Sequence, residues 1–265
     1  MLRPPNILTI AGSDSGGGAG IQADLKTMTM LGAYGMSVIT ALTAQNGLGV
    51  RGIHAPDPSF AVLQFQTVLD AFPVDAAKTG MLFSAAIMDA LAPMLEKKTF
   101  PLVVDPVCVS TSGHRLLEED AVETLKTRIL PLADLLTPNR HEAELLAGME
   151  IAGEDDIAEA GRRLIALGAK AVLIKGGHFA ENPIMVTDWL MEGNADPVPL
   201  RQPHISTPNT HGTGCTLSAA IATWLGFGMP LRVAVTRAQE YLNKGLVKAY
   251  APGEGAGPPN HMAWK

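Results

Sequence analysis

Short apolar runs alternate with longer amphipathic segments through most of this chain. Two of the runs, Leu102–Val104 and Val172–Ile174, are apolar at every position. This is typical of strands in a parallel sheet that helices cover on both faces. The alternation therefore predicts a doubly wound α/β fold. The predicted strands are Asn6–Ala11, Ser37–Ala44, Ala76–Gly80, Leu102–Asp105, Asp134–Thr137 and Ala171–Lys175. The predicted helices between them are Gly20–Leu31, Ser59–Phe72, Ser84–Lys97, Glu118–Leu130, Asn139–Ala147 and Ile157–Leu167.

The pattern changes after the sixth predicted strand. We expect a strand pair, Ile184–Met191 and Val198–Ser206, because a polar turn with Gly and Asn separates these two segments. Two further helices are predicted over Cys215–Trp224 and Arg232–Ala249, and a closing loop rich in Gly and Pro follows them. Neither a repeat nor a linker interrupts the sequence, so we expect residues 1–265 to form one domain.

Composition excludes several classes of protein. The chain has 265 residues, 47% of them hydrophobic, which is enough to bury a full core and excludes disorder. A net charge of −6 argues against a dedicated nucleic-acid binder. The apolar runs are too short for a membrane span or a secretory signal. Two Cys far apart in the sequence do not make a disulfide framework, so we expect a cytoplasmic protein.

Two glycine clusters differ in their context. Gly47–Gly52 matches the G-x-G-x-x-G dinucleotide pattern, but Pro56 and Pro58 follow where a helix should begin, so we reject this nucleotide site. The sequence contains no Walker-type phosphate loop. Gly12–Gly20 joins the first predicted strand to the first predicted helix, at the sheet edge where open α/β folds bind ligands. We interpret it as a ligand-binding loop, with a flexible tight turn as the alternative.

The strongest local signal is the turn Thr210–Thr216, which leads into an apolar helix. Glycines before a helix leave backbone N–H groups free, and the helix dipole adds positive charge there. Gly212, Thr213, Gly214 and Cys215 are therefore predicted to form an anion hole for a transferring phosphoryl group. The same field would lower the pKa of the Cys215 thiol, which favours a base or a nucleophile. The alternative is a glycine-capped turn with a small buried Cys.

Polar residues follow several predicted strands. Asp105 either faces the ligand crevice or bonds turn amides. Asn139 and Glu142 match a helix-capping box, or they hold Mg²⁺ through its waters, because Mg²⁺ takes one or two carboxylates plus phosphate oxygens. Lys175 supplies a cation beside flexible backbone, with a solvated Lys as the alternative. The His residues form no cluster with zinc-ligand spacing, so we exclude a zinc site. ATP-dependent phosphoryl transfer without a Walker loop explains this set best.

Several blocks of sequence occur in an order typical of one enzyme family. Residues 11–26 read AGSDSGGGAGIQADLK and residues 211–216 read HGTGCT, and these two blocks are the most specific. The other blocks are Ser37–Asn46, Lys78–Met81, Asp105–Val107, Thr137–Ala143 and Lys175–His178. In these blocks the chain resembles, over nearly its whole length, the hydroxymethylpyrimidine/phosphomethylpyrimidine kinases of thiamine biosynthesis, which belong to the ribokinase-like superfamily.

The resemblance implies a ribokinase-like fold with a central, mostly parallel sheet flanked by helices, ATP and Mg²⁺ as cofactors, and commonly a homodimer. It implies two successive transfers, to the hydroxymethyl group of 4-amino-5-hydroxymethyl-2-methylpyrimidine and then to the resulting monophosphate, giving the diphosphate. Cys215 would be the base for the attacking hydroxyl group. The residues implied to serve Mg-ATP are Asp105, Asn139, Glu142 and Lys175, with Mg²⁺ held through water by Asn139 and Glu142.

The resemblance also implies contacts with the pyrimidine. Asp24 and Gln45 would bond the aminopyrimidine edge, because a carboxylate accepts from an exocyclic amine and a carboxamide offers both a donor and an acceptor. Gly12, Met81 and Val107 would line the pocket around the ring.

Two departures from the family pattern and three alternative functions stay open at this point. Thr111 stands where we expect a Lys, which would alter phosphate affinity or the second transfer, and Gly257–His261 matches the closing motif only loosely. The alternatives are a pyridoxal/pyridoxine kinase, a non-catalytic sensor that binds the pyrimidine, and a sugar kinase, which Cys215 in place of the usual Asp disfavours. We also hypothesise that Gly47–Pro58 acts as a lid over the pyrimidine.

Overall fold

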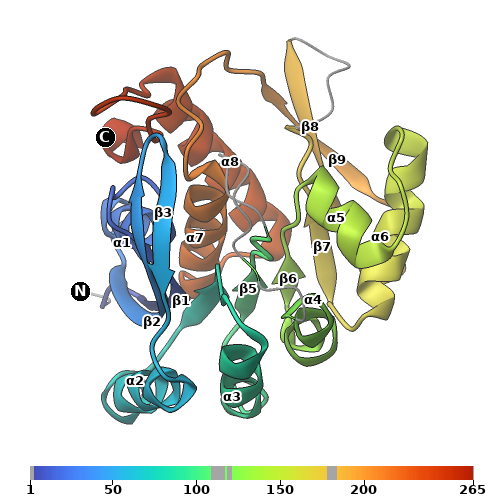
Figure 1. The fold of residues 1–265 in the computed structure, drawn as a ribbon. Coiled ribbons are helices and arrows are strands. Elements are labelled where there is room, and N and C mark those ends of the chain that lie inside the picture. The colour runs from blue at the N-terminus through green and yellow to red at the C-terminus, as the bar shows by residue number, and fades with distance from the viewer. Residues whose placement is uncertain (1–2, 109–116, 118–120, 178–183, 265) are drawn as a thin grey trace.

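The computed structural model describes residues 3–108, 117, 121–177 and 184–264. Its strands are β1 (Asn6–Asp14), β2 (Tyr34–Asn46), β3 (Gly49–His54), β4 (Ala76–Thr79), β5 (Leu102–Val104), β6 (Leu135–Leu136), β7 (Ala171–Ile174), β8 (Met185–Glu192) and β9 (Val198–Pro203). They form one sheet in the order β3-β2-β1-β4-β5-β6-β7-β8-β9 (Figure 1). Neighbours from β2 to β7 are parallel, and β3, β8 and β9 pair antiparallel at the two ends. The predicted mostly parallel sheet is confirmed.

Helices cover both faces of this sheet, as predicted (Figure 1). The α-helices are α1 (Gly20–Met30), α2 (Pro58–Ala71), α3 (Ala85–Leu95), α4 (Ala121–Thr124), α5 (Arg140–Ala147), α6 (Ile157–Ala166), α7 (Thr213–Gly226) and α8 (Leu231–Val247). One core lies between the sheet and α1, α7 and α8, and the other lies between the sheet and α2 to α6. In β5, Val103 belongs to the first core while Leu102 and Val104 belong to the second. This alternation explains why the strand is apolar throughout.

Four central strands end one residue earlier than the sequence predicted. β4, β5, β6 and β7 stop before Gly80, Asp105, Thr137 and Lys175. Because these strands are parallel, their carboxyl ends meet at the same edge of the sheet. The four residues that follow them are therefore gathered at that edge, where open α/β sheets bind ligands.

Part of Gly47–Pro58, the segment that we hypothesised to act as a lid, forms a strand. Gly49–His54 forms β3, which pairs antiparallel with β2 from Leu42 to Asn46. Residues 47–48 form the tip of this hairpin. The rejection of Gly47–Gly52 as a nucleotide site agrees with this arrangement, because these residues lie in a hairpin and not in a turn between a parallel strand and a helix. The missed strand carries two glycines in six residues, which weakens any strand signal.

The helix predicted over Glu118–Leu130 is shorter and less regular. Only Ala121–Thr124 is α-helical, and a π-helical turn, Leu125–Ile129, and a 3₁₀ turn, Leu130–Leu132, follow it. Pro131 lies in the 3₁₀ turn, where it has no N–H to donate and its ring excludes a regular α-helix. Residues 118–120 lie outside the described part of the chain, as does Thr111.

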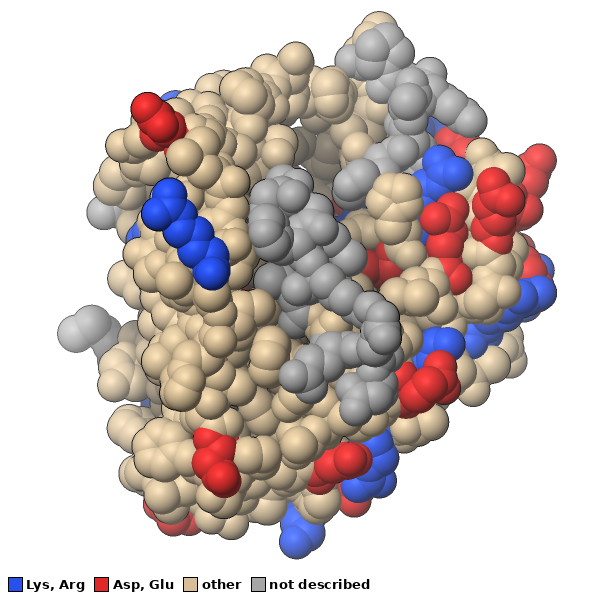
Figure 2. Space-filling view, viewed as in Figure 1, with Lys and Arg blue, Asp and Glu red and all other residues tan. Residues whose placement is uncertain are grey.

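Charged side chains of both signs gather over α5 and α6 on the face shown in Figure 2, where blue and red groups alternate. Ion pairs such as Arg163–Glu159, 2.8 Å apart, and Arg140–Glu144, 3.1 Å apart, lie in these helices. Among the helices of the described residues, none is long and apolar enough to cross a membrane.

Candidate active site

A cavity of about 750 Å³ opens at the carboxyl edge of the parallel strands. It is lined by residues from both halves of the sequence, and these include all the candidate site residues named above except Asp24, and Thr111, which lies outside the described part of the chain. Its lining includes Gly12, Met81 and Val107, which pack together, and Gln45. It also includes residues 212–215 and four polar residues, namely Asp105, Asn139, Glu142 and Lys175.

The turn of residues 210–216, called the anion turn below, begins α7. Gly212 precedes the helix with a φ of +77°. A Cβ atom there would lie 2.0 Å from the carbonyl oxygen of Gly18, so both the conformation and the space require glycine. Thr216 N–H donates to Gly212 O at 2.9 Å and starts the helix. The first-turn N–H groups of Gly214 and Cys215 have no carbonyl one turn earlier to bond, so they can receive an anion.

Cys215 is a neutral thiol in this arrangement. Burial raises the pKa of the Cys215 thiol to about 12, and the carboxylates of Asp24 and Asp105 act in the same direction. Lys78 and the Gly20 N–H lower the pKa but do not offset burial. The side chain still borders the cavity. The expected lowering of this pKa by the helix N-terminus is therefore wrong, because the loss of water outweighs the helix dipole.

Lys175 places a positive charge next to the anion turn. Its Nζ lies 3.1 Å from Asp105 Oδ1, and a Cβ atom on Gly214 would lie 3.5 Å from both Lys175 Nζ and Asp105 Oδ2. Burial lowers the pKa of Lys175, but Asp105 and Glu142 raise it by more, so the ammonium stays charged. Ser218 Oγ donates to Asp105 Oδ2 at 3.3 Å and fixes that carboxylate. The turn, the ammonium and the carboxylate thus form one polar cluster.

Asn139 and Glu142 form the capping box that the sequence predicted. Glu142 N–H donates to Asn139 Oδ1 at 2.9 Å, and Asn139 N–H donates to Glu142 Oε2 at 2.8 Å. Cys108 N–H also donates to Glu142 Oε1 at 3.3 Å. Burial raises the pKa of Glu142, and the nearby Asp105 adds to this. Both capping residues also line the cavity, so capping does not exclude a second role.

The donor chemistry at this edge fits Mg²⁺ held through water. Asp105 and Glu142 are buried carboxylates that both act on Lys175, and each is a ligand type that a hydrated divalent cation accepts. Among the described residues, no group of three or more His, Cys, Asp or Glu side chains could hold a metal ion directly. Carboxylates, waters and phosphate oxygens are the ligands that Mg²⁺ usually takes in such sites.

The part of the cavity around Gly12 and Met81 is mostly apolar, and Gln45 gives it one polar edge. Met81 and Ala41 form a local cluster, against which Val107 packs. A Cβ atom on Gly12 would lie 2.8 Å from Met81 Cε, so glycine lets the Met side chain lie against the backbone. Gln45 Oε1 accepts from Thr43 Oγ1 at 3.1 Å. This end can take a flat ring on its apolar side and bond the edge of that ring with Gln45.

Asp24 does not belong to the site. Its side chain is fully buried, accepts a hydrogen bond from Thr9 Oγ1 at 2.6 Å and pairs with Lys78 Nζ at 3.2 Å. It does not line the cavity. The prediction that Asp24 bonds the pyrimidine is therefore corrected, because α1 turns this residue toward the sheet and a buried lysine uses its charge.

Several cavity residues had no role in the sequence analysis. Asp14 and His211 lie within two matched blocks, but only their neighbours were assigned roles. A second lobe lies between β8, β9 and α8, and its polar residues include Asp188, Gln202, Gln239 and Asn243. Asp188 Oδ2 accepts from Gln239 Nε2 at 2.7 Å, and Gln202 Oε1 accepts from Asn243 Nδ2 at 3.1 Å. No spacing in the sequence marks this lobe, because its residues come from separate elements.

Comparison with known proteins agrees with this geometry. A family model described as phosphomethylpyrimidine kinase matches residues 14–260. The chain belongs to the phosphomethylpyrimidine kinase family. This kinase is 45% identical to the hydroxymethylpyrimidine/phosphomethylpyrimidine kinase of Streptomyces coelicolor, over 98% of this chain and 95% of that protein. It is 51% identical to the thiamine biosynthesis bifunctional protein ThiED of Geobacter sulfurreducens, over 97% of this chain but 52% of that protein, so it spans about half the length of this relative.

Solved structures show the same fold in a related group of enzymes. The ADP complex of Bacillus subtilis pyridoxal kinase superposes on this kinase with a TM-score of 0.89 and 35% sequence identity, covering 98% of each chain. The expected ribokinase-like architecture is confirmed by this likeness.

Proposed function

We propose that this kinase transfers the γ-phosphoryl group of Mg-ATP to the hydroxymethyl group of 4-amino-5-hydroxymethyl-2-methylpyrimidine, and then a second phosphoryl group to the monophosphate. The observation that carries the proposal is one cavity that joins an apolar pocket with Gln45 at its edge to an anion turn with Lys175 beside it. The names of the relatives from Streptomyces coelicolor and Geobacter sulfurreducens support the same substrate and pathway.

The pyrimidine ring would lie in the pocket between Met81 and Val107. Gln45 carries both a donor and an acceptor, which suits an aminopyrimidine edge with an amine and a ring nitrogen. With the ring held in this way, the hydroxymethyl group would point toward residues 212–215 of the same cavity. The pocket with Gln45 would thus recognise the ring, and the anion turn would bind phosphate.

The nucleotide would lie along the anion turn and the second lobe. Lys175 and the free N–H groups of the anion turn would bind the phosphates, where they stabilise the charge on the transferring group. Asn139 and Glu142 would hold Mg²⁺ through its waters, and the ion would neutralise phosphate charge when it is bound. The second lobe, with Ile205 and Leu246 among its apolar residues and Asn243 at its edge, would take the adenine.

The two transfers differ in their demand for a base. In the first, the hydroxymethyl oxygen bonds to the γ-phosphorus, the bond to the leaving ADP oxygen breaks, and the hydroxyl proton must leave. In the second, the attacking oxygen belongs to a phosphate monoester, which is already largely ionised at neutral pH. Cys215 is the candidate to take the proton in the first transfer only, and as a neutral thiol it would have to ionise in the loaded site.

A pyridoxal kinase activity is the second candidate. It is favoured by the likeness to the Bacillus subtilis pyridoxal kinase structure, although the identity to that chain, 35%, is lower than the 45% identity to the pyrimidine kinase of Streptomyces coelicolor. Pyridoxal also carries a ring hydroxymethyl group. Gln45 and Met81 are compatible with either ring, so the choice needs an assay.

The deciding experiment is product analysis by mass spectrometry. The purified protein is incubated with Mg-ATP and either the hydroxymethylpyrimidine or pyridoxal. We expect pyrimidine monophosphate followed by diphosphate. Monophosphate alone would contradict the second transfer, and pyridoxal phosphate alone would establish the second candidate. If neither substrate is phosphorylated but the pyrimidine raises the melting temperature, the protein is a sensor.

We propose further that the kinase is a cytoplasmic homodimer. Large apolar side chains are exposed on the β2–β3 hairpin and on α2, namely Leu42, Leu48, Phe60 and Leu63. A contiguous patch of such side chains is typical of an interface. Two free cysteines fit a reducing compartment. Sedimentation equilibrium should give twice the chain mass for the wild type and a shift toward monomer for Phe60→Asp; a wild-type monomer at micromolar concentration would contradict the dimer.

A further inference from the structure

Asp14 stands at the end of β1 and accepts four hydrogen bonds. Three come from the N–H groups of Gly16, Gly18 and Ala19, at 2.8, 3.0 and 2.8 Å. The fourth joins Asp14 Oδ2 to His211 Nε2 at 2.9 Å. The side chain of Asp14 is nearly fully buried. Burial alone would raise its pKa, but the hydrogen bonds from His211 and the backbone lower it overall, so Asp14 stays ionised.

The bond to His211 connects two loops that are almost 200 residues apart in the sequence. Residues 14–20, the glycine loop, lie against the anion turn, and the His211 side chain packs against Gly18 at this contact. A Cβ atom on Gly18 would lie 2.5 Å from His211 Cδ2, and one on Gly212 would lie 2.0 Å from Gly18 O. The backbone of His211 is fixed independently, because its N–H donates to Gly257 O at 3.1 Å. The His211 ring, which belongs to the anion turn, therefore links this turn to the glycine loop.

His211 also lies beside the side chain that is placed to recognise the substrate. Its Nε2 is 3.4 Å from the carboxamide nitrogen of Gln45. Because Nε2 faces a carboxylate at 2.9 Å, that nitrogen must carry the proton, and it has only one to donate. Asp14 takes that proton, which leaves the carboxamide of Gln45 available to the ring edge. Without Asp14, Nε2 of the neutral ring would be free to accept a hydrogen bond from the Gln45 carboxamide nitrogen that it faces at 3.4 Å, and this would occupy the donor of Gln45.

We propose that Asp14 is a positioning residue for phosphoryl transfer: through His211 it fixes the anion turn against the glycine loop and keeps Gln45 free for the substrate. The inference rests on the proposed function. It predicts a specific kinetic signature, because the variant site would misplace the anion turn and weaken the ring contact while leaving the second lobe and Lys175 unchanged. Turnover falls and the KM for the ring substrate rises, but the KM for Mg-ATP does not.

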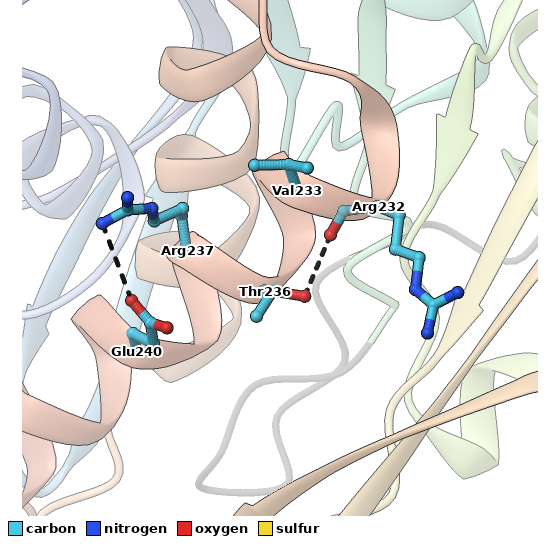
Figure 3. A pocket seen from close by; sticks show the side chains of 5 residues that line it. All are labelled: Arg232, Val233, Thr236, Arg237 and Glu240. Atoms are coloured by element: carbon cyan, nitrogen blue, oxygen red, sulfur yellow. Dashed lines mark hydrogen bonds and ion pairs between the residues drawn. The ribbon is translucent and has the colours of Figure 1, made fainter.

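A smaller hollow of about 240 Å³ on the outer side of α8 does not offer a comparable site. Arg232 and Arg237 line it, but Figure 3 shows their guanidinium groups pointing away from each other. Arg237 is 4.0 Å from Glu240, and Thr236 Oγ1 donates to the Arg232 carbonyl at 3.0 Å. Exposed side chains of this kind do not converge on a ligand.

The test uses two substitutions at one position. His211→Phe keeps a ring against Gly18 but removes the donor, and His211→Gln keeps an N–H near the position of Nε2. We expect kcat of His211→Phe to fall about 100-fold, as for a group misplaced by about an ångström, whereas His211→Gln should recover most of that loss. Asp14→Asn should behave like His211→Phe. The double variant Asp14→Asn/His211→Phe should be no slower than the worse single variant, because both remove the same contact.

The matched control is Asp57→Asn. Asp57 also accepts a backbone N–H, that of Ser59 at 2.8 Å, but it caps α2 away from the cavity, so its kinetics should equal those of the wild type. Wild-type turnover of the pyrimidine or of pyridoxal tests the proposed function by itself, and the variants are compared on whichever substrate is turned over. Equal impairment of His211→Phe and His211→Gln, near-wild-type kcat in His211→Phe, or multiplicative losses in the double variant would each overturn the positioning role. If Asp14→Asn fails to fold, the comparison of His211→Phe with His211→Gln still tests the positioning role.

Discussion

Acid should destabilise this kinase through one buried histidine, His261. It lies in a short 3₁₀ turn near the C-terminus, with 7% of its surface exposed, and its Nε2 is 3.1 Å from Thr216 Oγ1 in the first turn of α7. Burial lowers the pKa of His261 from 6.5 to about 4, and the charge of Lys26 adds to this. In the unfolded chain the imidazole regains its ordinary pKa.

Proton linkage gives the sign and the size of the change in the free energy of unfolding with pH. Between pH 6.5 and 4 the unfolded chain binds a proton at His261 that the folded protein does not, so stability falls as the pH falls. Each pKa unit corresponds to about 1.4 kcal/mol. Going from pH 7.5 to pH 4.5 should therefore cost the folded state about 2.5 kcal/mol through this one group. Above pH 7 the imidazole is neutral in both states and contributes no pH dependence.

Urea unfolding of the wild type and of His261→Gln at pH 7.5, 5.5 and 4.5 measures this. Gln does not titrate and can still bond Thr216, and the other titrating groups are common to both proteins, so their contributions cancel in the difference. We expect the wild type to lose about 2.5 kcal/mol more than the variant over this range. Parallel pH profiles for the two proteins would show that His261 is not held neutral and would refute the reasoning.

Three further variants test the site and its surroundings. Cys215→Ala should slow formation of the monophosphate by roughly 100-fold or more, as for loss of a general base. ATP binding should stay nearly intact, and the step from monophosphate to diphosphate should slow much less. Chromatography of both products checks this, and full activity in the first step would contradict the base role. Glu142→Gln keeps the capping box but removes the charge, so the Mg²⁺ concentration for half-maximal rate should rise about 10-fold; an unchanged Mg²⁺ titration would leave Glu142 only the capping role. Asp24→Asn leaves Lys78 buried without its carboxylate and should lower the free energy of unfolding by about 3–5 kcal/mol, with no selective rise in the KM for the pyrimidine, as urea unfolding and steady-state kinetics can show.

Much of the fold followed from local sequence. The apolar strands β5 and β7 and the helices around them were predictable, because strands with two buried faces and amphipathic helices leave clear patterns. β3 was missed because its glycines and exposed side chains carry no such pattern; it is a strand only through its antiparallel pairing with β2. The irregular turns after α4 follow from Pro131, which could have been used as a boundary from the sequence alone.

Site features that depend on a short local motif were predictable from the sequence, whereas features that depend on packing between distant segments were not. The glycine turn before α7 and the Asn139–Glu142 capping box are local, and the structure contains both, while anion binding by the turn stays a prediction. The prediction that Asp24 bonds the pyrimidine came from the family resemblance, and it disagrees with the helical pattern of buried residues in α1. In this helix Asp24 shares a buried face with Ile21, Thr27 and Met28, a spacing that already points toward the sheet. Asp14 was overlooked because its partner, His211, lies at the far end of the sequence.

The neutral state of Cys215 bears on how one site could serve both proposed transfers. With its pKa raised to about 12, the Cys215 thiol is almost entirely neutral at pH 7.5, so it acts as a base only where the bound substrates lower that pKa. Phosphoryl transfer through a loose transition state depends mainly on positioning and charge stabilisation, with little help needed from the nucleophile. The fixed parts of the site, the N–H groups of the anion turn and the Lys175 ammonium, act equally on a neutral hydroxyl and on an anionic phosphate that approaches the γ-phosphorus. A site built around a strong base would favour the hydroxyl alone, whereas this arrangement suits two nucleophiles of different charge.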